Sequence, residues 1–213
     1  RRLITGLFGT YVPKEIVASA VTALCGAGKL RSVVDAIEGA TAAPTVKDAV
    51  WSQLSTNDIL QEVLAPDSMD AEMLKLLATH IGAEAADPML DALAASESRQ
   101  KRRQLIDIIV ALGAGVVPAV AQRLNDGRWF VQRNMLAILT GMPELPSDFD
   151  VALYMDHTEP RVRREAYRIL MRSPVTRERA LGKALTDPEE RNVRLALSAV
   201  LEEGCPQAVF SLV

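Results

Sequence analysis

Two glycine-rich stretches have residue types that could bind phosphate groups. Gly26-Ala27-Gly28-Lys29 has the glycines and the lysine of a phosphate-binding loop, in which backbone N–H groups and a lysine contact phosphate oxygens. However, Ala23 stands where that motif requires its first glycine, and Leu30 stands where a serine or threonine would bind magnesium. The stretch 113–115 is followed by Pro118 where a dinucleotide fingerprint places its third glycine. Neither stretch predicts a nucleotide site.

Histidine and cysteine, the usual catalytic and metal-binding residues, are rare. His80 and His157 are the only histidines, and neither has a partner at metal-ligand spacing. Cys25 and Cys205 lie far apart in the sequence and form no metal or redox motif. The sequence therefore predicts a protein that is not an enzyme, with no cofactor and no metal, in a reduced, cytoplasmic setting.

Arginine and tryptophan give the strongest indication of a binding surface. Trp129 lies between Arg128 and Arg133, and tryptophan and arginine are enriched where proteins bind one another most tightly. Packing of Trp129 between helix turns is the structural alternative. Arginines at three- and four-residue steps would form one basic stripe on a helix: they are Arg161, Arg164, Arg168 and Arg172. A solvated face, partly neutralised by neighbouring glutamates, is the alternative for that stripe.

Composition indicates a helical protein of ordinary globular type. The chain has 213 residues, of which 49% are apolar, 24% charged and 4% aromatic. Alanine and leucine are abundant, and both favour helices. No run of about 18 to 20 apolar residues is long enough to span a membrane, because the best candidate, Leu105–Val120, contains Asp107 and Pro118. The sequence starts without Met and ends in the apolar stretch Ala208–Val213, which leaves open whether it is a piece of a longer protein.

A repeat of about 31 residues, within the range typical of stacked helical units, organises most of the chain. Asp126–Gly141, Asp156–Ser173 and Asp187–Gly204 share a turn aspartate, then a valine followed by a polar residue that serves as an anchor. Apolar residues follow each anchor at three, six and seven positions, which lie on one side of a helix. The anchors are Arg102, Gln132, Arg163 and Arg194, and the apolar positions after them are Leu105, Ile108 and Ile109; Met135, Ile138 and Leu139; Ala166, Ile169 and Leu170; Leu197, Val200 and Leu201.

Shorter amphipathic segments alternate with these helices and predict the other helix of each pair. They cover 87–95, 116–124, 149–155 and 176–185. Asp187 before Pro188 predicts a helix N-cap, and Gly113, Gly141 and Gly204 predict helix ends. The weaker apolar pattern before Asp70 indicates an irregular start.

The combination of a turn aspartate, a Val-Arg pair and an apolar face resembles the HEAT repeat, in particular the bacterial form that also occurs in phycobilin-lyase-like proteins. The resemblance implies an all-α fold, an α-solenoid of stacked antiparallel helix pairs like those of armadillo proteins. We expect one HEAT-like domain over residues 1–213, irregular over 1–69 and regular over 70–213. It also implies a structural ladder between neighbouring repeats, in which Asp156 with Arg163, and Asp187 with Arg194, occupy the family's positions. Gln132 departs from that pattern.

Charge is distributed unevenly along the chain, which has a net charge of −3 overall. Residues 99–213 contain 17 basic and 14 acidic side chains, whereas residues 1–98 contain 7 and 13. We therefore expect a scaffold that binds another protein, through an acidic segment of that partner, at Arg128, Trp129, Arg133, Arg161, Arg164 and Arg168. A solenoid that binds nucleic acid and a phycobilin-lyase-like enzyme remain alternatives, and the oligomeric state is open.

Overall fold

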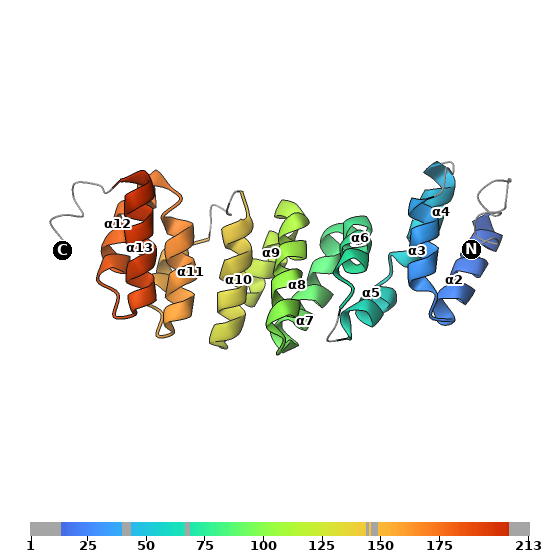
Figure 1. Cartoon of the computed structure of the whole chain (residues 1–213), viewed down its shortest axis with the longest axis horizontal. Coiled ribbons are helices and arrows are strands. Elements are labelled where there is room, and N and C mark those ends of the chain that lie inside the picture. The colour runs from blue at the N-terminus through green and yellow to red at the C-terminus, as the bar shows by residue number, and fades with distance from the viewer. Residues whose placement is uncertain (1–13, 40–43, 67–68, 144, 146–148, 205–213) are drawn as a thin grey trace. The chain divides into compact units, whose positions relative to one another are not determined.

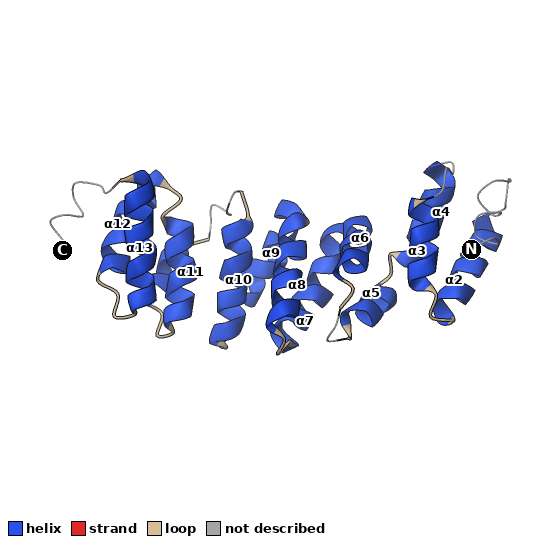
Figure 2. Cartoon of the chain, viewed as in Figure 1, coloured by secondary structure: helices blue, strands red, loops and turns tan. Residues whose placement is uncertain are grey.

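A computed structural model describes residues 14–39, 44–66, 69–143, 145 and 149–204. Every regular element within these ranges is a helix, and no strand occurs among them (Figure 2). The predicted all-α class is confirmed. Cys205 and the apolar stretch Ala208–Val213 lie outside the described residues.

The chain divides into two compact units, residues 1–108 and 109–213. The elements follow one another as labelled in Figure 1. The first unit contains α2 (Lys14–Gly26), α3 (Leu30–Glu38), α4 (Pro44–Leu54), α5 (Asn57–Leu64), α6 (Ala71–Ile81), the 3₁₀ helix η1 (Gly82–Ala85), α7 (Ala86–Ala95) and most of α8 (Arg99–Ala111). The second contains the end of α8, η2 (Gly113–Val116), α9 (Val117–Arg123), α10 (Trp129–Gly141), η3 (Val151–Asp156), α11 (Pro160–Leu170), α12 (Pro174–Leu185) and α13 (Glu190–Glu203). The single domain predicted for residues 1–213 stays a prediction.

Packing within each unit joins helices that are close in the sequence. In the first unit α2 packs against α3 and α4, and α5 packs against α6 and α7. In the second unit α10 packs against α9 and α11, and α11 also contacts η3, α12 and α13. Helix α11 therefore lies at the centre of the second unit.

The local structure repeats at the predicted interval around two glycines. Gly82 follows α6 and Gly113 follows α8, one repeat later, and both have a φ of +77°. Glycine adopts this left-handed conformation without the steric cost of a Cβ atom, which suits it to ending a helix. Each glycine opens a 3₁₀ turn that leads into the next helix. The predicted helix end at Gly113 is confirmed, as is the one at Gly204, whose φ is +81°.

Gly141 has a different role from the predicted one. It is the last residue of α10 and has no positive φ. A Cβ atom at this position would lie 2.8 Å from Cγ2 of Val110, which is closer than van der Waals contact allows. Close approach of two segments, and not a left-handed helix end, explains this glycine.

The predicted buried positions are correct in α8, α10 and α11 and partly wrong in α13. The three positions that follow each anchor at three, six and seven residues are buried in all three of those helices. In α13, Leu197 is 48% and Leu201 is 87% exposed, and Val200 is half-buried. Helix α13 contacts α12 and α11 and buries Asn192 and Ala196, and no further helix follows it in the described chain. The apolar pattern is present, but nothing in the described chain covers it.

The weaker pattern near the start of the chain also marks buried residues. Val21, Val50, Leu54, Met73 and Leu77 are buried, whereas Leu24, Cys25 and Leu76 are half-buried.

Helix boundaries agree with the predicted segments within a few residues, with two differences. The segment 149–155 forms the 3₁₀ helix η3. Asp187 is not the N-cap of α13, because that helix begins at Glu190 and Glu189 precedes it as the N-cap. The carboxylate of Asp187 still caps the turn, since it accepts a hydrogen bond from the Glu189 backbone N–H at 2.9 Å.

Candidate binding surface on helices α10 and α11

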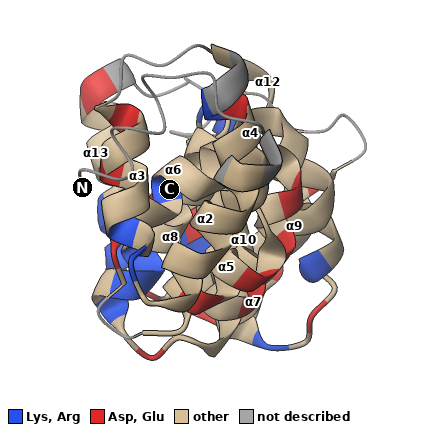
Figure 3. Cartoon of the chain, turned by 90° about the vertical axis from the view of Figure 1, so that its right-hand side faces the viewer, with Lys and Arg blue, Asp and Glu red and all other residues tan. Residues whose placement is uncertain are grey.

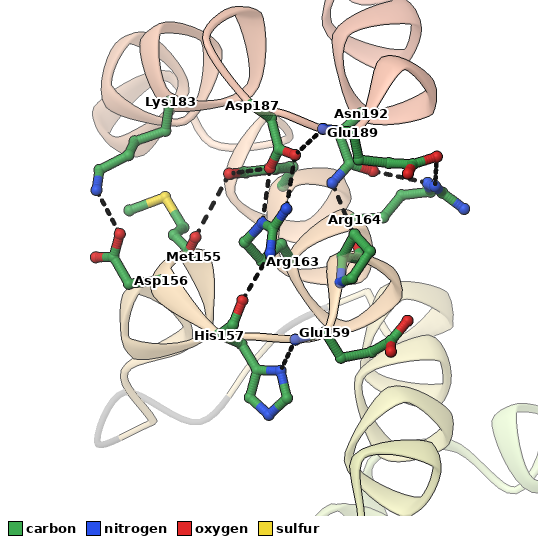
Figure 4. Close-up of polar contacts among 12 residues, drawn as sticks. Met155, Asp156, His157, Glu159, Arg163, Arg164, Lys183, Asp187, Glu189 and Asn192 are labelled. Carbon is green, nitrogen blue, oxygen red and sulfur yellow. Dashed lines mark hydrogen bonds and ion pairs between the residues drawn. The ribbon is translucent and has the colours of Figure 1, made fainter.

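A buried ion pair connects α11 to the turn before α13. The Arg163 guanidinium donates to both carboxylate oxygens of Asp187, with two distances of 2.7 Å (Figure 4). The side chain of Arg163 is 12% exposed and that of Asp187 is 1% exposed. Arg163 also donates to the carbonyl oxygens of His157 at 2.8 Å and Thr158 at 3.1 Å. The Arg163 side chain thus connects the turn before α11 to the turn before α13.

Asp187 has enough hydrogen-bond donors to stay ionised although it is buried. Tyr167 donates its hydroxyl to Asp187 at 2.9 Å, in addition to the contacts from Arg163 and the Glu189 N–H. Burial alone would raise the pKa of Asp187, but these hydrogen bonds outweigh it and hold the pKa well below its ordinary value. Burial and the hydrogen bond to Asp187 raise the pKa of Tyr167, which stays protonated as a donor. This cluster is a structural junction, and its carboxylate is neither exposed nor poised for proton transfer.

Arg164, predicted to bind a partner, belongs to the same junction. Its Nε donates to the Asn192 side-chain oxygen at 2.9 Å, and Asn192 donates in turn to the Pro160 carbonyl oxygen at 3.1 Å (Figure 4). A guanidinium nitrogen of Arg164 lies 3.7 Å from a carboxylate oxygen of Glu189, and the side chain of Arg164 is only 18% exposed. Arg164 therefore joins α11 to α13 inside the protein.

Asp156 and Arg194, the other residues of the predicted ladder, differ in how far away their partners lie in the sequence. Asp156 pairs with Lys183, and hydrogen bonding by Lys183 lowers the pKa of Asp156. Arg194 donates to Glu190, one turn earlier in α13, at 2.5 and 3.1 Å. Arg163 pairs with Asp187 and Asp156 pairs with Lys183 across successive helix pairs, whereas no ion pair between Asp156 and Arg163 or between Asp187 and Arg194 is found among the described residues.

Three of the four anchor residues, Arg102, Gln132 and Arg163, share a role that the sequence pattern did not reveal. Arg102 donates to the carbonyl oxygens of Ser96 and Glu97 at 2.9 and 2.8 Å, as Arg163 does to the residues six and five positions before it. Gln132, the departure from the pattern, donates to the Leu124 carbonyl at 3.2 Å. Each of these anchors ties its helix to the turn that precedes it. The sequence does contain a signal for this role, because each of these helices has a long hydrogen-bond donor, arginine or glutamine, at the same place after the turn.

Trp129 and Arg161 meet at the start of α10 and α11. The centre of the Arg161 guanidinium lies 5.2 Å from the Trp129 ring centroid, within the range of a cation–π contact. Phe130 packs edge-on against Trp129 with a centroid distance of 5.9 Å, and Arg128 lies 5.4 Å from the Phe130 ring centroid. Both aromatic side chains are half-buried. We call Arg128, Trp129, Phe130 and Arg161 the aromatic–arginine cluster.

Carboxylates lie close to most of the predicted arginines. Arg128 makes a two-point contact with Asp126, with distances of 2.7 to 3.2 Å, and this hydrogen bonding lowers the pKa of Asp126 to about 2. Arg168 donates to both oxygens of Glu165 at 2.9 and 3.0 Å. Arg133 is half-buried in α10. Figure 3 colours the basic and acidic residues on the helices. Arg164 and Arg168 of the predicted stripe each lie beside a glutamate, so the stripe is less positive than its arginines alone suggest.

The histidines and the cysteine within the described ranges have structural surroundings. His80 stacks on Trp51 with ring centroids 3.8 Å apart, and Nδ1 of His157 accepts the Glu159 N–H at 2.9 Å. Burial, followed by the charge of Glu62, raises the pKa of Cys25. The described residues contain no group of three or more metal-ligating side chains. The glycine-rich stretch at 26–29 forms the turn between α2 and α3, where Gly28 has a φ of +69°.

An open cavity of about 670 Å³ lies between α5, α7 and the start of α8 in the first unit. Lys101 lines it but is only 7% exposed. Its ammonium group donates to the carbonyl oxygens of Leu64 at 2.6 Å and Pro66 at 3.1 Å. Lys101 thus caps the end of α5, a contact that sequence spacing could not reveal because 37 residues separate the donor from the Leu64 acceptor.

Comparisons with protein-family models, curated proteins and solved structures find no match. No single helix in the described parts of the chain is both long enough and apolar enough to cross a membrane.

Proposed function

We propose that the chain is a HEAT-like α-solenoid that serves as a non-catalytic scaffold and binds another protein through helices α10 and α11. The repeat register supports this architecture, as do the recurrent glycine turns and the hydrogen bonds from Arg102, Gln132 and Arg163 to their preceding turns. In a solenoid each repeat contacts its neighbours, and the surface made by successive helices is available to partners.

The contact between Trp129 and Arg161 is the observation that carries the proposal of a binding surface. A half-buried indole under an exposed guanidinium combines apolar contact area with charge, which is the combination enriched at protein interfaces. The side chains of Arg128 and Arg161 are 56% and 59% exposed. Their charge favours an acidic segment of the partner, because complementary charge speeds encounter and selects among partners.

Replacement of Trp129 by alanine tests this proposal. We expect Trp129→Ala to weaken partner binding by more than ~1 kcal/mol while the protein stays folded. Val175→Ala is a suitable control, because Val175 is apolar and 90% exposed but lies outside the aromatic–arginine cluster. Wild type and both variants would be used to capture partners from an extract of the source organism, and the captured protein would then be titrated against each by calorimetry.

Two outcomes would contradict the proposal. If Trp129→Ala lowers the melting temperature and leaves affinity unchanged, Trp129 only packs the two helix starts together. Capture of nucleic acid in place of protein would favour the alternative of a nucleic-acid-binding solenoid. The affinity of the chain for that nucleic acid would then fall steeply as the salt concentration rises.

A further inference from the structure

Arg161 differs from the other arginines near it in how much of its hydrogen-bonding edge is occupied. The Trp129 ring lies beneath its guanidinium, and among the described residues the closest carboxylate oxygen, on Glu159, is 3.6 Å from its Nε. Hydrogen bonds between guanidinium and carboxylate groups are usually about 2.7 to 2.9 Å long. The pairing with Glu159 is therefore loose.

The neighbouring arginines are held more tightly. Arg128 contacts both oxygens of Asp126, and Arg168 contacts both oxygens of Glu165. Arg164 is committed to Asn192 inside the junction. Arg161 thus combines high exposure, a cation–π contact with Trp129 and a weak internal partner.

We propose that Arg161 is the specificity-determining residue of this surface, which receives a carboxylate of an aspartate or glutamate in the partner through a two-point contact. Glu159 is the internal carboxylate that the partner displaces. This inference rests on the proposed function, since it names the group that the α10–α11 surface recognises.

The contact with the Trp129 ring is what gives Arg161 this role. A guanidinium is planar and presents parallel N–H donors that match the two oxygens of a carboxylate, whereas a lysine ammonium is a point charge without a fixed plane. Contact with the Trp129 ring restricts the orientation of that plane, so less conformational freedom is lost when a carboxylate binds. Trp129 at the same time offers apolar area to the aliphatic part of the bound residue.

Glu159 is suited to act as a displaceable competitor. Its carboxylate oxygen accepts the Arg161 backbone N–H at 3.4 Å as the N-cap of α11, and it lies 3.6 Å from the Arg161 side chain. Both distances are long for a charged acceptor. Exchange for a better-placed carboxylate would therefore cost little, and removal of the Glu159 charge should strengthen binding.

The same unit contains a matched pair of residues for control experiments. Arg194 is exposed and pairs with Glu190 in its own helix, but no aromatic contact to it is found among the described residues. Arg161→Lys and Arg194→Lys make the same chemical change, as do Glu159→Gln and Glu190→Gln. Any effect of net charge alone is equal within each pair.

Fluorescence anisotropy with labelled hexaglutamate as the probe, and hexaglutamine as the uncharged reference, measures the recognition directly. We expect Arg161→Lys to weaken hexaglutamate binding by ~10-fold and Arg194→Lys by less than about twofold. Glu159→Gln should tighten binding by ~3-fold, whereas Glu190→Gln should leave it nearly unchanged. Thermal melting of each variant verifies that the fold is retained.

The inference is overturned if the two lysine variants, or the two glutamine variants, behave alike. It is also overturned if the full chain fails to bind hexaglutamate, or if a hexanucleotide displaces that peptide at lower concentration. These outcomes are distinct from failure of the proposed function, which is decided by the effect of Trp129→Ala on the captured protein partner. A partner lost by Trp129→Ala but retained by Arg161→Lys would leave the scaffold proposal standing and remove the role of Arg161.

Discussion

Helices α11 and α13 have the same repeat register but opposite surroundings. Arg163 and Arg194 are corresponding anchors in successive repeats, yet Arg163 is held in a buried junction and Arg194 is exposed to solvent. Ala166 is fully buried, whereas its counterpart Leu197 is 48% exposed. Corresponding residues of the two repeats should therefore contribute different free energies to folding.

The difference shows what a repeat pattern specifies and what it leaves to the neighbouring element. Spacing decides which side of a helix is apolar, but burial requires another segment to cover that side. In α11 the covering segments are η3, α10 and the helices that follow. A substitution in α11 should therefore cost far more than the same substitution at the corresponding position of α13.

The largest difference is expected for aspartate at the close-packed position. Ala166→Asp should destabilise the protein by about 4 kcal/mol or more, because a carboxylate would be buried without a partner. Leu197→Asp should cost less than ~1 kcal/mol, mostly through the lower helix propensity of aspartate. Chemical denaturation of both variants measures the two free energies of unfolding.

Arg168→Asp is a further control within α11, since the side chain of Arg168 is 45% exposed. It should destabilise much less than Ala166→Asp. Equal losses for Ala166→Asp and Leu197→Asp would show that the two helices are equally covered in solution, which would contradict the comparison.

The second difference concerns the anchors. Arg163→Ala should cost about 3 kcal/mol, since it leaves the buried Asp187 carboxylate without its main counter-charge. Arg194→Ala should cost no more than ~0.5 kcal/mol, as is usual for an exposed ion pair within one helix. Thermal melting distinguishes these cases, and a loss from Arg194→Ala as large as that from Arg163→Ala would refute the assignment of Arg163 to a junction.

Much of the fold could be predicted because it follows from local pattern. The repeat spacing predicts the helices and most of their buried positions, and Gly113 marks a helix end by its backbone freedom alone. Gly141 looked the same in the sequence, but its reason is contact with Val110, one repeat earlier in the chain. A single sequence does not reveal close approach between segments.

The candidate site was harder to predict than the fold, since pairing depends on atoms that lie far apart in the sequence. The sequence placed Arg161 and Arg164 on one stripe, one helical turn apart. In the structure Arg161 lies over Trp129 and Arg164 donates to Asn192. Which of two similar arginines stays available to a partner is decided by residues in the preceding and following repeats.

The smallest expected effect is a change in the acid sensitivity of the junction. The pKa of Asp187 in the folded protein lies below its ordinary value of 3.8, so the unfolded chain binds a proton at a higher pH than the folded protein does. The stability contributed by Asp187 is therefore fully present above about pH 4 and is lost as the pH falls toward the lowered pKa. The slope for one such group approaches about 1.4 kcal/mol per pH unit.

Asp187→Asn should remove this slope, because asparagine binds no proton in this range. Asp156→Asn is the control, since Asp156 also has a lowered pKa but its side chain is 66% exposed, where solvent screening weakens its coupling to folding. Urea denaturation of wild type and both variants between pH 5 and pH 3, about one unit on either side of an ordinary carboxylate pKa, measures the slopes. We expect the Asp187→Asn curve to be the flatter of the two and Asp156→Asn to follow wild type. If the two variants exchange these results, the acid-sensitive contact is the exposed pair with Lys183, and Arg163 does not hold α11 to the turn before α13 in the way the geometry indicates.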